Sequence, residues 1–489
     1  MNLFYPPFVT YLPLIIKLFE SNPAIALKIF AGFCIVLSGI SMYQFVFQVT
    51  KKRSIALLSA IFYLIAPYKL ANVYKRFAIG EFTAMVFMPY VFLGIYNLFE
   101  QDGKKHYFIA IGAIGLMLSH TITTLYTALF CIAYILFNYK KLKEKDIIKK
   151  CIINVIFILL VTMLFWLPLL EAKTKAEYAI LDSTVMGTNG KYTSSQTISL
   201  TQLFKDKGEE NGTTFLLGLP TLFALILTVF ASKHVDEKYK SFYLISIIFS
   251  LVSIFMASKF FPWLIMPNLI CKLQYPWRMV GYANFFLSFV CGINLYEFLK
   301  NIKVNLLIKN SLIVLFTILS IISSLSIQSQ FFAEDKELDN KYLSSIPEDK
   351  KISHKNINRD YMPLKALKGQ NTFVFARKDK TYILKGQAEI ENENKQDLND
   401  EVIIKDATKD TIFEFPYYFY PGYKIILQTQ NEDIELQAVE SEQGYVSCSL
   451  PKDIESGTLK VAYVRYFYYI FFLYCIWYFS STIYWVYCL

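Results

Sequence analysis

The sequence is short of charge and of histidine. Only 18% of its 489 residues are charged, whereas soluble domains contain about 25%. Its 4 histidines, at positions 106, 120, 234 and 354, are scattered along the chain, so we expect no three-histidine zinc site and no other metal. The 8 cysteines include no CxxC pair, which argues against a disulfide framework or a thiolate metal site. No glycine-rich phosphate loop, HExxH or GxSxG motif occurs, and we expect no cofactor.

Long apolar runs take the place of charge. Hydrophobic residues make up 55% of the chain and aromatic residues 17%. Runs of about 18 or more apolar residues are long enough to cross a bilayer core of about 30 Å. We therefore predict an α-helical polytopic protein of the cell membrane, with about 10–12 spans. The clear runs are 24–49, 55–67, 82–99, 107–119, 121–138, 151–170, 214–231, 241–257, 279–299, 311–328 and 466–487.

The net charge of +10 is concentrated in short linkers between these runs. The linkers alternate along the chain between two sets. Lysine and arginine are frequent in one, the dense set, and rare in the other. The positive-inside rule places the dense set in the cytoplasm, so the charge indicates topology rather than nucleic-acid binding. The dense set consists of 51–54, 100–106, 138–150, 232–240 and 300–310.

Residues 107–138 test this topology. A single helix over this range would be about 48 Å long and would put its two basic flanks on opposite sides of the membrane. A hairpin that turns near His120 keeps both flanks in the cytoplasm, and we predict the hairpin.

Three parts follow from these patterns. Residues 1–328 form a multi-span membrane domain, and residues 466–489 form a C-terminal span. Between them, residues 329–465 contain short alternating stretches and turn signals, which predict an extracytoplasmic β-sandwich of about seven strands. The polar run ENENKQDLND is interpreted as a separator between strands. This part contains four clustered tyrosines, Tyr417, Tyr418, Tyr420 and Tyr423. We expect them either to stack on sugar or to pack on the membrane surface.

Ionisable residues gather on the predicted external face. Arg76 and Glu81 flank a small turn in YKRFAIGEF, His120 lies at the hairpin tip, and Arg278 follows Trp277 in LQYPWRM. Charged groups at membrane depth are costly, so they tend to be paired or functional. Guanidinium groups recognise phosphate bidentately. The alternatives are a structural ion pair between Arg76 and Glu81, a structural histidine, and an interfacial anchor at Trp277 and Arg278.

These motifs occur together in one group of proteins. In chain order, the motifs are YPPF near the start, IAPYKLANVYKRFAIGEFTA, LSH at a hairpin, LQYPWR before a span and PYYFYPGYK in a sandwich. The chain resembles bacterial multi-span proteins of the YfhO-like type and the membrane family described as 6-pyruvoyl-tetrahydropterin synthase related. The pterin description implies a zinc enzyme, which the histidine content argues against.

The resemblance implies the GT-C fold of integral membrane glycosyltransferases. Such an enzyme takes a sugar from a polyprenyl-phosphate carrier and passes it to an extracytoplasmic acceptor of a cell-surface polymer. In this chain the implied roles are catalysis for Glu81 and donor-phosphate binding for Arg76, His120 and Arg278. The expected partners are the lipid-linked sugar, a surface glycan or polymer and membrane lipid, with no nucleic acid.

The implied fold usually carries its catalytic acid in a first external loop, directly after the first span. We expect that this span and its loop are missing from the sequence. The alternative is therefore a non-catalytic relative that binds or helps to move lipid-linked sugars. A transporter is less favoured, because the charged residues cluster at one face rather than at mid-depth.

Overall fold

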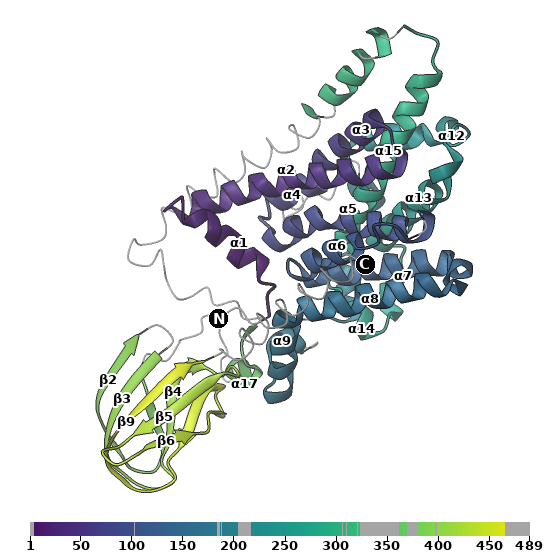
Figure 1. Ribbon diagram of the computed structural model, residues 1–489. Coiled ribbons are helices and arrows are strands. Elements are labelled where there is room, and N and C mark those ends of the chain that lie inside the picture. The colour runs from purple at the N-terminus through teal and green to yellow at the C-terminus, as the bar shows by residue number, and fades with distance from the viewer. Residues whose placement is uncertain are drawn as a thin grey trace, which may run out of the picture. The chain divides into compact units, whose positions relative to one another are not determined.

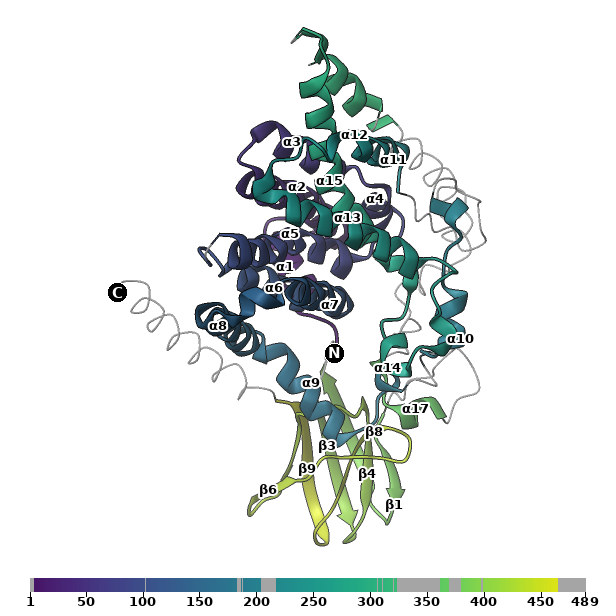
Figure 2. The same cartoon turned by 90° about the vertical axis from the view of Figure 1, so that its right-hand side faces the viewer.

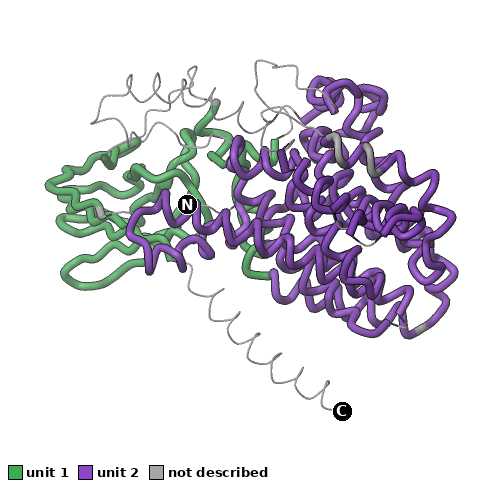
Figure 3. Tube along the Cα trace, turned by 90° about the horizontal axis from the view of Figure 1, so that it is seen from above, with its two compact units in different colours: residues 1–4, 163–187, 346–489 green, residues 5–162, 188–345 purple. Residues whose placement is uncertain are grey.

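The computed structural model consists of two compact units, coloured separately in Figure 3. Unit 1 contains residues 1–4, 163–187 and 346–489, and unit 2 contains residues 5–162 and 188–345. The predicted span 466–487 lies outside the described residues, and so does part of 311–328. The structure describes residues 4–101, 103–182, 186, 188–203, 217–305, 307–309, 311–319, 321–322, 361–368, 380–396 and 399–464.

Unit 2 is helical, as predicted. Its described residues include four helices long and apolar enough to cross a membrane, namely α2, α5, α13 and the segment Pro276–Asn301 that contains α15. The helices, with their bounds, are α1 (Phe8–Lys17), α2 (Pro23–Thr50), α3 (Arg53–Leu64), α4 (Pro67–Tyr74), α5 (Ile79–Glu100), α6 (Phe108–Met117), α7 (Thr121–Phe137), α8 (Lys145–Val161), α10 (Gly190–Ser195), α11 (Leu219–Ile226), α12 (Thr228–Ala231), α13 (Glu237–Ala257), α14 (Asn268–Cys271) and α15 (Met279–Asn301).

Helices α5 and α15 form the centre of unit 2 and are buried on nearly all sides. Figure 2 shows α13 beside α15. Phe285 of α15 packs against Phe45 and Phe92, with ring centroids 5.9 Å and 5.1 Å apart, and Phe242 packs edge-on against Phe289 at 5.4 Å. Aromatic pairs at such distances favour offset or edge-to-face geometry. The core is thus a continuous aromatic layer shared by α2, α5, α13 and α15.

The predicted hairpin over residues 107–138 is confirmed. Helices α6 and α7 are separate, and residues 118–120 turn between them. At the far end of α7, Tyr134 donates to Glu100 at 3.3 Å and the Lys141 ammonium lies 2.9 Å from the same carboxylate. Because Glu100 ends the helix that precedes α6, α7 runs back along the hairpin.

Three predicted spans differ in detail. The range 55–67 becomes two helices, α3 and α4, bent by 47°, since Pro67 starts a new helix. The range 151–170 is divided at Thr162 between α8 and α9, and the side chain of Thr162 bonds back to Ile158 O at 2.7 Å. Of the range 214–231, the described part forms two short helices, α11 and α12.

Unit 1 combines helix α9 with an antiparallel sandwich (Figure 1). One sheet has the order β1-β4-β8-β7 and the other β2-β3-β9-β5-β6. The described residues form nine strands rather than about seven. The elements are α9 (Met163–Lys175), α17 (Leu364–Lys368), β1 (Tyr382–Lys385), β2 (Glu389–Gln396), β3 (Asn399–Ala407), β4 (Ile412–Tyr418), β5 (Tyr423–Gln428), β6 (Asp433–Leu436), β7 (Val439–Glu440), β8 (Tyr445–Ser449) and β9 (Ile454–Tyr463).

The polar run ENENKQDLND is not a separator. Its first part belongs to β2 and its last part to β3, which pair in antiparallel register from Glu389 opposite Lys405 to Gln396 opposite Asn399. Strand β2 is the edge of its sheet, and an edge strand tolerates charged residues because one side meets no further strand.

Three of the four tyrosines noted in the sequence pack internally. Tyr417 is buried in the sandwich core at 1% exposure. Tyr418 stacks on Tyr445 with ring centroids 4.9 Å apart, and Tyr420 stacks on Tyr178 at 5.6 Å. These three rings therefore stabilise unit 1.

Candidate functional site

The corner between α4 and α5 places Arg76 and Glu81 face to face. Helix α4 ends at Tyr74, and the backbone N–H of Arg76 still bonds to Ala71 O at 2.9 Å. Phe77 then adopts a positive φ of 43°, which is uncommon for a residue with a side chain. The reversal lets α5 start at Ile79, so that Glu81 lies in its first turn.

A second segment comes from the entrance of α15. Gln274 has a positive φ of 68°, and Pro276–Arg278 form a 3-10 turn that leads into the helix. Arg278 donates from Nη1 to the Gln274 amide oxygen at 2.9 Å. This bond fixes the guanidinium group at the mouth of α15.

Glu81 joins the two segments. Its Oε2 lies 3.3 Å from Nη1 of Arg76 and 3.7 Å from Nε of Arg278. Its Oε1 accepts from the Tyr68 hydroxyl and from the Asn72 amide, the latter at 3.2 Å. The carboxylate is buried, and a buried charge persists only when it is paired and hydrogen-bonded. Glu81 therefore holds both arginines in place.

Aromatic rings support the same two arginines. The guanidinium carbon of Arg76 lies 4.3 Å from the Trp277 ring centre, and that of Arg278 lies 4.9 Å from Tyr275 and 5.5 Å from Trp277. Tyr275 and Trp277 are themselves stacked, with centroids 5.0 Å apart. A guanidinium group binds to an aromatic face while its N–H groups stay directed outward in the ring plane. The stack thus fixes two cations without using all their donors.

His120 arrives from the hairpin tip and begins α7. Its Nδ1 accepts from the Thr123 backbone N–H at 3.3 Å and lies 2.7 Å from the Thr123 hydroxyl. A neutral imidazole that accepts at Nδ1 carries its proton on Nε2. No described residue hydrogen-bonds to Nε2, so the ring presents a donor.

Because Gly80 has no side chain, His120 and the N-terminal segment can approach the first turn of α5, which contains Glu81. A Cβ at Gly80 would lie 2.6 Å from the Tyr5 hydroxyl, 2.9 Å from Ser119 O and 3.2 Å from Cδ2 of His120. No side chain fits in that space, so glycine is required. Burial raises the pKa of Tyr5, and its hydroxyl therefore stays protonated beside the charged cluster.

The structure brings together all four residues singled out in the sequence, namely Arg76, Glu81, His120 and Arg278. Their roles stay predictions. Sequence reasoning missed Tyr68, Asn72 and Gln274, and it interpreted YPPF as structural although its tyrosine reaches the site. One signal was present, since Tyr68, Asn72 and Arg76 follow each other at four-residue spacing, which puts them on one helix face.

Metal ligands do not gather in the described part of the chain. There, no three His, Cys, Asp or Glu side chains are placed to hold an ion. The cluster itself contains two guanidinium groups, one carboxylate, an imidazole and phenol hydroxyls, a set that suits an anion.

The apolar helices define an integral membrane protein, and the cluster is a buried group of two guanidinium groups and one carboxylate. The chain belongs to the membrane protein family described as 6-pyruvoyl-tetrahydropterin synthase related domain, whose family model matches residues 3–331. The resemblance found in the sequence is thereby confirmed. The matched range includes Tyr5 and all four candidate residues, and it excludes the sandwich.

One similar protein comes from Lactococcus lactis subsp. cremoris (strain MG1363) and is described as an uncharacterized protein. It is 27% identical over 280 residues, which are 54% of this chain and 44% of the relative. The match thus spans less than half of the relative's length.

Proposed function

We propose that this protein is an integral membrane glycosyltransferase of the GT-C type. It takes a sugar from a polyprenyl-phosphate carrier and passes it to an extracytoplasmic acceptor during assembly of a cell-surface polymer. The observation that carries the proposal is the pair of guanidinium groups, Arg76 and Arg278, held side by side on Trp277 with a single carboxylate between them.

The charge balance of the cluster favours a phosphate ligand. Two arginines and Glu81 leave one positive charge in a buried setting, and the uncharged His120 adds an N–H donor. Buried cations without a full set of counter-charges are costly, so an incoming phosphate oxygen is stabilised there. Such groups also stabilise the negative charge that develops on a leaving lipid phosphate during sugar transfer.

An apolar cavity in the same unit suits the lipid chain of the carrier. Its volume is about 220 Å³, and it lies between α7 and α13. Met279, the residue after Arg278, and Tyr126 both line it, and the Tyr126 hydroxyl donates to Leu273 O at 3.3 Å, in the segment that leads to Arg278. We expect the first isoprene units of a carrier whose phosphate binds at Arg278 to lie in this cavity.

Glu81 is the proposed base for the acceptor hydroxyl. Its two oxygens already accept from Tyr68 and Asn72 and pair with both arginines. To take a proton it has to exchange one of these partners, and phosphate binding to the arginines offers that exchange. If Glu81 keeps all of these partners, it cannot accept a proton. Its full set of partners therefore favours the second candidate, a non-catalytic protein that binds or helps to move lipid-linked sugars.

The carrier site is tested by binding of polyprenyl phosphate to the purified full-length protein in nanodiscs, followed by native mass spectrometry. Arg278→Ala is expected to weaken binding by about tenfold or more, because charge-assisted hydrogen bonds contribute about 1.5–3 kcal/mol. Arg53→Ala, an exposed arginine at the start of α3, is the matched control. Equal affinity for wild type and Arg278→Ala contradicts the carrier site.

Sugar transfer is tested in the organism that encodes the protein. Deletion of the gene is expected to remove a sugar from a surface polymer, as read by mass spectrometry, and Arg278→Ala is expected to fail to restore it. A protein that binds the carrier but transfers no sugar from any polyprenyl-phosphate sugar supplied to it is the non-catalytic candidate.

A further inference from the structure

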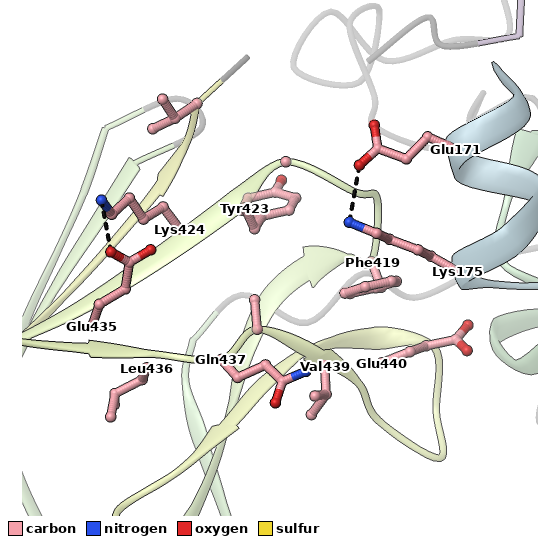
Figure 4. Close-up of a pocket in the computed structure, with 13 residues that line it drawn as sticks. Glu171, Lys175, Phe419, Tyr423, Lys424, Glu435, Leu436, Gln437, Val439 and Glu440 are labelled. Atoms are coloured by element: carbon pink, nitrogen blue, oxygen red, sulfur yellow. Dashed lines mark hydrogen bonds and ion pairs between the residues drawn. The ribbon is translucent and has the colours of Figure 1, made fainter. Parts of the chain in front are cut away.

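Unit 1 contains a cavity of about 620 Å³ at one edge of the sandwich. β6 and β7 each end their sheet, and only residues 437–438 join them, so the two edges lie together. Figure 4 shows the lining, which comes from this edge, from β5 and from Glu171 and Lys175 of α9. The volume lies within the range of about 300–1,000 Å³ found for small-molecule sites.

Two aromatic rings give the cavity an apolar surface. Tyr423, at the start of β5, is half-buried, and Phe419 lies beside it in the lining. The Tyr423 ring packs edge-on against Tyr463, with centroids 5.1 Å apart. A ring held in this way offers a fixed face at low cost in side-chain entropy.

The charged groups around the rings are arranged in pairs. Lys175 lies 2.9 Å from Glu171, and Lys424 lies 2.9 Å from Glu435 (Figure 4). Both pairs border the cavity. They hold ammonium donors and carboxylate acceptors in place while leaving the lining nearly neutral overall.

One carboxylate oxygen of Glu440, on β7, accepts no hydrogen bond from a described residue. Its carboxylate is 10% exposed, and its Oε2 lies 3.1 Å from the Lys365 ammonium. Its Oε1 is buried, and no described residue donates a hydrogen bond to it. A buried acceptor without a donor costs about 1–3 kcal/mol, so a ligand that brings a hydroxyl group to this oxygen recovers that energy.

We propose that this cavity binds a neutral carbohydrate. Sugar hydroxyls donate to carboxylates and accept from ammonium groups, and the C–H face of a pyranose ring packs on an aromatic face. The cavity offers all three, with Glu440 as acceptor, Lys424 and Lys175 as donors and Tyr423 as the aromatic face. An anionic ligand would meet three carboxylates, and a cationic ligand would meet the lysines.

The inference goes beyond the proposed function, because a glycan can bind here whether or not unit 2 transfers a sugar. A surface glycan fits both the cavity of unit 1 and the acceptor of the proposed sugar transfer. Failure of one proposal therefore leaves the other standing, since carrier binding depends on Arg278 and glycan binding on Glu440.

The experiment uses the full-length protein in nanodiscs, free of maltoside and glucoside detergents, whose sugar heads would compete. The probes are neutral oligomers of glucose, galactose and N-acetylglucosamine at millimolar concentration, with binding measured by saturation-transfer NMR and calorimetry. Glu440→Gln removes the acceptor charge with little change of shape. Glu401→Gln is the matched control, since Glu401 pairs with Lys460 at 3.4 Å on the same sandwich and is not part of the lining.

We expect at least one oligomer to bind, Glu440→Gln to weaken it by about tenfold and Glu401→Gln to leave it unchanged. Tyr423→Ala is expected to abolish the contact of the sugar C–H protons in the NMR spectrum. The proposal is overturned if no oligomer binds, or if binding is the same in wild type, Glu440→Gln and Tyr423→Ala.

Discussion

The guanidinium carbon of Arg76 lies 4.3 Å from the centre of the Trp277 ring, although the two residues belong to segments far apart in the sequence. The contact joins the α4–α5 corner to the entrance of α15. It joins two loops into one cationic surface and places the Trp277 indole against a guanidinium group.

Replacement of Trp277 tests this surface. Trp277→Ala is expected to weaken polyprenyl phosphate binding by about 2- to 30-fold, because a cation–π contact contributes about 0.5–2 kcal/mol. Trp277→Phe keeps an aromatic face and is expected to retain most of the affinity. Trp263→Phe is the control, since Trp263 is buried elsewhere in unit 2 and donates to Met256 O at 2.9 Å. Affinity that is unchanged in Trp277→Ala would mean that the indole is only an anchor.

Replacement of Glu81 separates chemistry from positioning. If Glu81 is the base, Glu81→Gln lowers kcat for sugar transfer by about 100-fold or more, while carrier binding stays equal or tightens because a competing anion is gone. If Glu81 only positions the arginines, carrier binding weakens together with kcat, and Glu81→Asp restores part of both. Measuring KM, kcat and carrier affinity on the same variants distinguishes the two.

The sequence predicted the helical membrane fold well, because apolar runs of membrane length are a strong signal. It also predicted the hairpin at His120, since the charge of its flanks excludes a single helix. It did not predict the division at Thr162, because a run of apolar residues has the same composition whether or not its helix is broken.

The candidate site was predicted in part. Arg76, Glu81, His120 and Arg278 stood out because charge is rare beside apolar runs. Tyr68, Asn72 and Gln274 did not, since uncharged polar residues are common at helix ends. Only the fold shows that Tyr68 and Asn72 hydrogen-bond to Glu81 and that Gln274 hydrogen-bonds to Arg278. Strand β2 was missed because its exposed, charged sequence lacks the alternation of a half-buried strand.

The orientation of the sandwich is testable by labelling. The positive-inside rule predicts that residues 100–106 face the cytoplasm and that the sandwich is outside. In intact cells, Lys409→Cys is expected to react with a membrane-impermeant maleimide, and Lys104→Cys is expected to react only after lysis. Both positions are exposed, and the parent protein controls for its own cysteines. The reverse pattern would place the sandwich in the cytoplasm and rule out an external acceptor site there.

Two glycines predict opposite effects on the stability of unit 2. A Cβ at Gly292 of α15 would lie 2.1 Å from the Ser59 hydroxyl oxygen and 2.9 Å from its backbone nitrogen in α3. Gly292→Ala is therefore expected to destabilise by about 1–3 kcal/mol, because small residues allow membrane helices to approach closely. Gly32 of α2 has nothing within 4 Å, so Gly32→Ala is expected to be neutral or stabilising by up to about 1 kcal/mol. Thermal unfolding in detergent checks both, and equal stability of the two variants would argue against this α3–α15 contact.

Asp400 predicts how the stability of the sandwich depends on pH. It is buried on β3, and burial together with nearby Glu393 raises its pKa to about 7, against about 3.9 in an unfolded chain. Between these two values the folded state binds more protons than the unfolded state, so the free energy of unfolding decreases as pH rises from about 4 to about 7 and is level above that. Asp400→Asn is expected to flatten this slope and to stabilise the sandwich at pH 8 by about 2–4 kcal/mol. The measurement is hydrogen exchange of β3 and β9 in the full-length protein, corrected for the intrinsic effect of pH, with exposed Asp406→Asn on the same strand as control. A slope that persists in Asp400→Asn would assign the pH dependence to another group.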